Sequence, residues 1–166
     1  FFNVPSVTFL FTKVMCLPLA LVFSTYNLKD SLGLDSGYPD GKVLTASISG
    51  AISIDIRPSN PYAKIRDLTG IEDFTSLEIL TCDGNALTTI DLSQNVALKT
   101  LRCAQNSLTS LNLVGAVNLE SIYCDLNQIT SLDVSQNLKL NYLKCFSNSL
   151  TSLDLSKTRN SPTLGA

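Results

Sequence analysis

Residues 77–160 repeat one pattern four times without a gap, at a period of 21 residues. The copies read LEILTCDGNALTTIDLSQNVA, LKTLRCAQNSLTSLNLVGAVN, LESIYCDLNQITSLDVSQNLK and LNYLKCFSNSLTSLDLSKTRN. A unit this short cannot bury its apolar residues alone and must stack on its neighbours. The repeat therefore predicts a solenoid, in which equivalent residues of successive copies form rows along the stack.

The spacing within one copy excludes both an amphipathic helix and a single strand. A helix needs apolar steps of three and four residues and a strand needs steps of two, but here steps of three and two alternate. In the first copy these positions are Leu77, Leu80, Cys82, Asn85, Leu87, Ile90, Leu92 and Asn95. The copy also divides into two halves of similar form. The pattern predicts a mostly β coil with two short parallel strand ladders on opposite sides and little helix.

The motif L-x-x-L-x-C-x-x-N-x-L-T-x-L-D-L-S resembles the leucine-rich repeat, specifically a short bacterial type of 21 residues. The resemblance extends over residues 43–166 and implies a leucine-rich-repeat solenoid. It also implies a secreted or surface-displayed recognition scaffold that is often part of a longer protein. The fold of such a scaffold does not identify the ligand that it binds.

The rest of the chain divides around these copies. We expect a signal-like or cap segment at 1–24, a turn-rich amino-terminal cap region at 25–50, a divergent first repeat at 51–76 and a truncated fifth repeat at 161–166. In the divergent repeat, AISIDI predicts a strand with Ile54 and Ile56 facing inward, and a helical turn is expected around Glu72. In the fifth repeat, Leu164 takes the position of Leu143. The chain starts without Met and stops within a repeat, which indicates a fragment.

The first 24 residues allow three interpretations. Residues 14–23 form an unbroken apolar run after Lys13, with the length of a signal-peptide core and too few residues to span a bilayer. Val22 and Ser24 are small enough for a cleavage site, which predicts a mature chain starting near Thr25. Alternatively, FNVPSVTFL resembles the segment that precedes the amino-terminal cap in this family, and the run would pack in that cap. A membrane anchor is the third possibility.

Composition argues against catalysis. The chain has no His and a formal net charge of −2. Histidine is the commonest general base and metal ligand, and its absence removes Ser-His-Asp and Cys-His arrangements. We therefore expect no enzyme activity, no metal and no small-molecule cofactor. The charge also provides no electrostatic basis for binding nucleic acid.

Two rows of identical residues predict structural ladders. Equivalent positions in adjacent parallel strands lie about 4.8 Å apart, so a row of Cys cannot converge on one zinc ion, and its parallel side chains would strain a disulfide. We expect buried free thiols. An Asn at a tight corner can bond the backbone of its own coil and of the neighbouring coil. The two rows are Cys82, Cys103, Cys124 and Cys145, and Asn85, Asn106, Asn127 and Asn148.

The outward residues differ between the two sides of the coil. On the second side they hardly vary, and a row of Asp91, Asn112, Asp133 and Asp154 suggests a stabilising ladder, with calcium binding as an alternative. On the first side they vary from copy to copy and include residue types that anchor protein interfaces. An ordinary β surface, where aromatic residues are also favoured, is the competing interpretation. The candidate ligand-binding residues are Arg102, Tyr123, Tyr142, Lys144 and Phe146.

Together these features predict a non-catalytic recognition module, secreted or at the cell surface. Its expected partner is a protein or glycan outside the cell, bound through the variable face of the repeats. Two alternatives remain. The chain could be a spacer or targeting arm of a larger secreted or surface protein, possibly an enzyme, or a purely structural stalk whose variable face binds nothing.

Overall fold

The computed structural model describes residues 50–58, 64–158 and 162–164. The signal-like or cap segment at 1–24, its cleavage site and nearly all of the cap region at 25–50 lie outside the described residues, so these expectations stay predictions.

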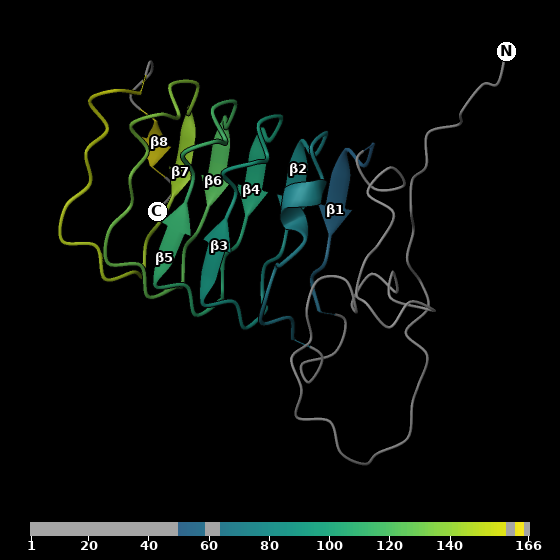
Figure 1. The fold of residues 1–166 in the computed structure, drawn as a ribbon. Helices are drawn as coiled ribbons and strands as arrows, with labels where there is room; N and C mark the ends of the chain where they lie inside the picture. The colour runs from purple at the N-terminus through teal and green to yellow at the C-terminus, as the bar shows by residue number, and fades with distance from the viewer. Residues whose placement is uncertain (1–49, 59–63, 159–161, 165–166) are drawn as a thin grey trace, which may run out of the picture.

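The described chain winds into a stack of coils whose first side forms one parallel sheet (Figure 1). The strands of this sheet, in spatial order, are β1 (Ser53–Asp55), β2 (Ile79–Thr81), β4 (Thr100–Arg102), β6 (Ser121–Tyr123), β7 (Tyr142–Lys144) and β8 (Thr163–Leu164). The register from β2 to β8 advances by one 21-residue repeat per strand, so Leu80 lies beside Leu101 and Leu143 beside Leu164. The expected position of Leu164 is confirmed.

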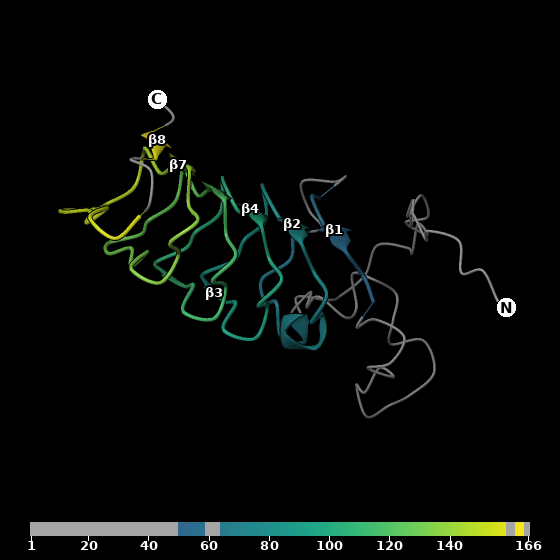
Figure 2. The same ribbon diagram turned by 90° about the horizontal axis from the view of Figure 1, so that it is seen from above.

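The second side carries a shorter sheet, in which β3 (Thr89–Asp91) pairs with β5 (Ser110–Asn112) in parallel. The equivalent residues of the third and fourth copies, 131–133 and 152–154, are not in strand conformation. Viewed from above, the stack curves gently with the longer sheet along its inner side (Figure 2). Coils on the outer side of a curve are spaced more widely, which disfavours strand pairing on this side.

The predicted fold class is confirmed: the chain is a parallel β-solenoid of the leucine-rich-repeat kind, with almost no helix. Within the described residues, the helical structure is one 3-10 turn, η1 (Ile71–Asp73), at the place expected around Glu72. Strand β1 forms as expected, with Ile54 and Ile56 buried. Inward residues form columns through the stack, such as Leu80, Leu101, Ile122 and Leu143, each inaccessible to solvent. Burying a side chain of this size contributes about 1.5–3 kcal/mol.

The first Asn row joins each coil to the one before it. Asn127 donates from Nδ2 to the carbonyl oxygens of Cys103 at 3.0 Å and Cys124 at 3.1 Å, while its Oδ1 accepts the Leu108 N–H at 3.0 Å. Asn106 and Asn148 repeat this arrangement one coil earlier and one coil later. The Cys103 and Cys124 carbonyls therefore each accept hydrogen bonds from two Asn side chains, which satisfies backbone groups at a corner that strand pairing leaves free.

A second row of corner residues holds Asn95 and Asn137 but is interrupted in the second copy, where Ala116 follows Gly115. Gly115 packs against the backbone of the preceding coil so closely that a Cβ there would lie 1.7 Å from the Ser93 carbonyl oxygen. Any larger residue would push the two corners apart. Asn95 and Asn137, on either side of this interruption, each donate to two backbone carbonyls of the preceding corner.

The residue before each Asn of the first row has a left-handed backbone conformation. Gly84 has φ 76° in the first copy, but the equivalent residues of the later copies are Gln105 (φ 55°), Leu126 (φ 57°) and Ser147 (φ 52°). An L-residue pays about 1–2 kcal/mol for this conformation and glycine does not. The later copies thus carry a local strain that the first copy avoids.

We expect Leu126→Gly to stabilise the protein by about 0.5–1 kcal/mol, because relief of this strain outweighs the extra entropy of glycine in the unfolded chain. Leu126 keeps 41% of its surface exposed, so its side chain loses less packing than a core leucine would. Urea denaturation followed by circular dichroism measures the effect. Leu126→Ala is the matched control, since it removes the side chain but keeps the Cβ. Equal stability of the two variants would show that the backbone conformation is not the cause.

Candidate functional site

The structure places the five candidate ligand-binding residues on the outer surface of the six-stranded sheet. Arg102, Tyr123 and Lys144 occupy equivalent positions on β4, β6 and β7 and are neighbours in the register. Tyr142 begins β7 beside Ser121, and Phe146 follows the end of the same strand. Residues from three copies of the repeat are therefore brought onto one surface, which we call the variable face.

Direct contacts join these side chains. The rings of Tyr123 and Tyr142 have centroids 5.0 Å apart and are tilted by 34°. The guanidinium carbon of Arg102 lies 4.6 Å from the centre of the Tyr123 ring, and Nζ of Lys144 lies 4.8 Å from the centre of the Phe146 ring. Aromatic pairs and cation–π contacts are both favourable at these distances. The variable face therefore carries two aromatic–cation clusters.

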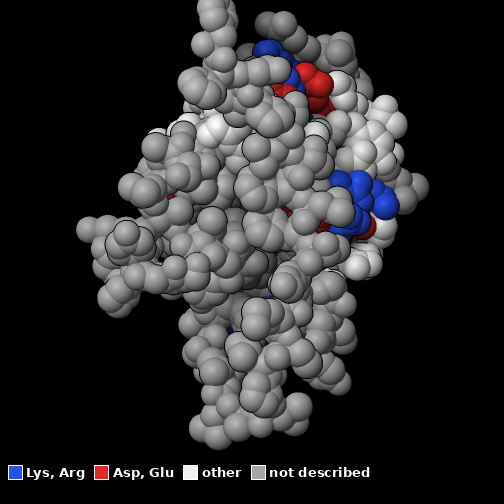
Figure 3. Space-filling view, turned by 90° about the vertical axis from the view of Figure 1, so that its right-hand side faces the viewer, with Lys and Arg blue, Asp and Glu red and all other residues white. Residues whose placement is uncertain are grey.

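Sequence reasoning missed the carboxylates that hold the cations in place. Asp83 in the first copy lies 3.1 Å from Nε of Arg102 in the second and also accepts the N–H of Ala104. Asp125 in the third copy lies 3.8 Å from Nζ of Lys144 in the fourth. The repeat register did not reveal these pairs, because Arg102 follows Asp83 by 19 residues and not by 21, so the acid and the base belong to different rows. Figure 3, viewed from the β1 end of the stack, shows basic and acidic surface next to each other.

The Cys row forms a column of thiols inside the stack. Cys82, Cys103 and Cys124 are buried, Cys145 is half-buried, and all four are free. Burial raises the pKa of the Cys124 thiol to about 12 and raises the pKa of Cys82 and Cys103 well above the ordinary value of 9.0, because a thiolate would lose its solvation there. Cys82 also donates to the Arg102 carbonyl oxygen at 3.2 Å. These thiols stay protonated at neutral pH and are not nucleophiles.

The acidic row on the second side caps turns. The Oδ1 atoms of Asp91, Asp133 and Asp154 each accept the backbone N–H of the Ser two residues later, at 2.8–2.9 Å. These N–H donors lower the pKa of Asp133 and Asp154. Asn112 continues the row by donating to Asp91. Among the described residues, no group of three or more His, Cys, Asp or Glu side chains could hold a metal ion.

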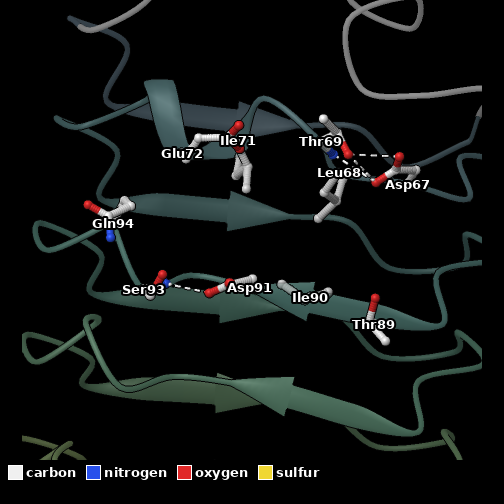
Figure 4. A pocket seen from close by; sticks show the side chains of 10 residues that line it. All are labelled: Asp67, Leu68, Thr69, Ile71, Glu72, Thr89, Ile90, Asp91, Ser93 and Gln94. Carbon is white, nitrogen blue, oxygen red and sulfur yellow. Dashed lines mark hydrogen bonds between the residues drawn. The ribbon is translucent and has the colours of Figure 1, made fainter.

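A shallow polar pocket of about 410 Å³ lies on the second side, between η1 and β3 (Figure 4). Its three carboxylates already accept hydrogen bonds: Asp67 from the N–H and hydroxyl of Thr69, Glu72 from the Gly70 N–H, and Asp91 from the Ser93 N–H. None of the five candidate ligand-binding residues lines it. The pocket is therefore separate from the variable face, and its acids are engaged with the local backbone.

Comparison with solved structures identifies the same fold in two internalins. One is described as the functional domain of InlJ from Listeria monocytogenes, which includes a cysteine ladder. It is 41% identical over 69% of this chain, with a TM-score of 0.64, and the match covers 25% of its own length. The other is the internalin InlF from Listeria monocytogenes strain 4b F2365, which is 21% identical over 74% of this chain and 42% of its own, with a TM-score of 0.56. At that identity it shows the fold alone.

No protein-family model and no curated protein matches the chain. The expected resemblance to leucine-rich-repeat proteins is confirmed at the level of the fold, since the structural neighbours are internalins. The assignment to a short bacterial repeat type stays a prediction. The chain spans a quarter and about two-fifths of the two matched proteins. In the part of the chain that the structure describes, no helix is long and apolar enough to cross a membrane.

Proposed function

We propose that this chain is a non-catalytic recognition module that binds a protein or glycan outside the cell through its variable face. The observation that carries the proposal is the convergence of Arg102, Tyr123, Tyr142, Lys144 and Phe146, from three copies of the repeat, on one surface with direct contacts between them. The solenoid's likeness to internalins supports a role in protein interaction.

The chemistry of the variable face suits binding. Tyr and Arg are the residue types most often found at energetic hot spots. Tyr123, Tyr142, Arg102 and Lys144 are half-buried against one another and against carboxylates of the preceding coils. Side chains already held in position lose less conformational entropy when a partner binds. The second side, with its uniform hydroxyl and carboxylate rows, offers no comparable cluster of anchors.

A second candidate function is a spacer or targeting arm of a larger secreted or surface protein. The limited coverage of the matched internalins favours it, because this chain corresponds to a quarter of one and less than half of the other. In that case the variable face would contribute nothing to activity, and the repeats would only set the distance between other parts of the protein.

The decisive experiment screens the full chain against arrays of extracellular proteins and glycans, beside a variant with Arg102, Tyr123, Tyr142 and Phe146 all replaced by Ala. We expect the variant to lose binding by at least about 30-fold, since a single hot-spot truncation typically costs 2 kcal/mol or more. The matched control replaces the exposed Thr88, Thr109, Thr130 and Thr151 of the second side by Ala and should bind like the parent. Circular dichroism checks the folding of both variants. Equal binding by all three proteins, or no binding at all, would favour the spacer.

A further inference from the structure

The described basic residues of the variable face are already paired with acids from the preceding coil. Arg102 contacts Asp83 at 3.1 Å, Lys144 contacts Asp125 at 3.8 Å, and Lys99 contacts Glu78 at 2.9 Å. Each ion pair joins neighbouring copies of the repeat, so every one of these cations is neutralised by an acid of the coil before it. The aromatic part of the face therefore has a local charge close to zero, although it contains both Arg and Lys.

In two of these pairs the cation also contacts an aromatic ring, Arg102 that of Tyr123 and Lys144 that of Phe146. The side chains of Asp83 and Asp125 keep only 15% and 8% of their surface exposed. An anionic partner that drew Arg102 or Lys144 outward would leave a largely buried carboxylate without its counterion, which is strongly unfavourable. It would also remove the cation from the face of Tyr123 or Phe146. The geometry thus opposes recruitment of these cations by sulfated, phosphorylated or acidic ligands.

The face also exposes apolar side chains. Phe146 keeps 37% of its surface exposed and Ile79, on β2 of the same sheet, keeps 40%. The tilted Tyr123–Tyr142 pair joins β6 to β7, and Phe146 follows the end of β7. Ile79 and Tyr142 are equivalent residues three strands apart, about 14 Å at about 4.8 Å per strand, and the row between them consists of Thr100 and Ser121. Apolar side chains of a partner would contact Ile79 and the aromatic rings, and uncharged polar groups would contact the hydroxyls between them.

We propose that the variable face recognises a protein whose contacting surface is uncharged and carries aromatic or aliphatic side chains, with ionic contacts making little contribution. This inference rests on the proposed function and specifies the chemistry of the partner. It predicts an affinity that depends weakly on salt, because only unpaired charges produce a strong ionic-strength dependence. Polyanions, including sulfated glycans, should not bind at this face.

The test is a selection of random peptides on the immobilised full chain, with removal of peptides that also bind the Arg102/Tyr123/Tyr142/Phe146 quadruple Ala variant. We expect the retained peptides to be rich in aromatic and aliphatic residues with little net charge. Their dissociation constants should change by less than about threefold between about 50 and 500 mM NaCl. Acidic peptides, a tenfold or larger weakening with salt, or selective binding of neutral oligosaccharides in place of peptides would overturn the inference.

Heparin provides a second, independent probe. The full chain should not bind heparin, whereas Asp83→Asn/Asp125→Asn should acquire salt-dependent binding, because this change leaves Arg102 and Lys144 without their counterions. Heparin binding by the unmodified chain that the quadruple variant loses would contradict the inference. The outcomes also separate the two proposals. Face-dependent acidic peptides would overturn only the partner's chemistry, while a selection with no face-dependent peptide would count against the proposed function itself.

Discussion

Replacing Asn127 with alanine is expected to destabilise the protein by about 3–5 kcal/mol, a large part of the 5–15 kcal/mol that a typical domain possesses. The variant loses donors to the carbonyls of Cys103, Cys124 and Asp125 and leaves the buried Leu108 N–H without an acceptor. An unsatisfied buried donor costs about 1–3 kcal/mol, and each lost hydrogen bond contributes about 0.5–1.5 kcal/mol. The coupling of the third coil to the second depends directly on these bonds.

Urea denaturation followed by circular dichroism measures this loss, with Asn118→Ala as the matched control. Asn118 also bonds the preceding coil, through the Val96 carbonyl, but this hydrogen bond is exposed and water can replace it. The control should therefore lose no more than about 1 kcal/mol. An equally small decrease in the free energy of unfolding for both variants would show that the Asn row does not stabilise the stack.

Much of the architecture could be predicted from the sequence because every coil needs inward apolar residues and corner residues at the same positions. The inward Leu, Ile and Cys positions recur at fixed intervals, so the columns through the core and the register of the long sheet follow from the repeat alone. The same pattern predicts strand β1 with Ile54 and Ile56 facing inward, and a turn at Glu72. Asn127 and its equivalents were recognisable as corner residues because polar side chains at otherwise apolar positions must find backbone partners.

Other features depend on how far apart neighbouring coils lie, which a repeat pattern does not encode. The second strand ladder stops after β5, and Gly115 lies directly against the Ser93 backbone of the preceding corner. The left-handed conformation of Leu126 was equally hidden, since only the first copy marks that position with glycine. At the candidate site, residue types showed which face varies, but the pairing of Asp83 with Arg102 and of Asp125 with Lys144 required coordinates.

Stability should also fall steeply at alkaline pH because of the buried thiol column. Below the ordinary thiol pKa of 9.0, Cys82, Cys103 and Cys124 are protonated in both the folded and the unfolded chain, and their contribution is fully present. Above it, the unfolded chain releases these protons while the folded chain retains them, up to about pH 12 for Cys124. The folded state then binds more protons than the unfolded state, so the free energy of unfolding decreases as pH rises.

Each buried thiol should contribute a slope of about 1.4 kcal/mol per pH unit above pH 9, or about 4 kcal/mol per unit for the three together. Urea denaturation between pH 7 and 11 in an oxygen-free buffer with a phosphine reductant measures the slope. Cys103→Ala should reduce it by about a third. Leu101→Ala, at an equally buried position in the same coil, creates a larger cavity but removes no titrating group, so it should lower stability at every pH without changing the thiol contribution to the slope. An unchanged slope in Cys103→Ala would mean that the thiol ionises inside the folded stack, and that the column is open to solvent.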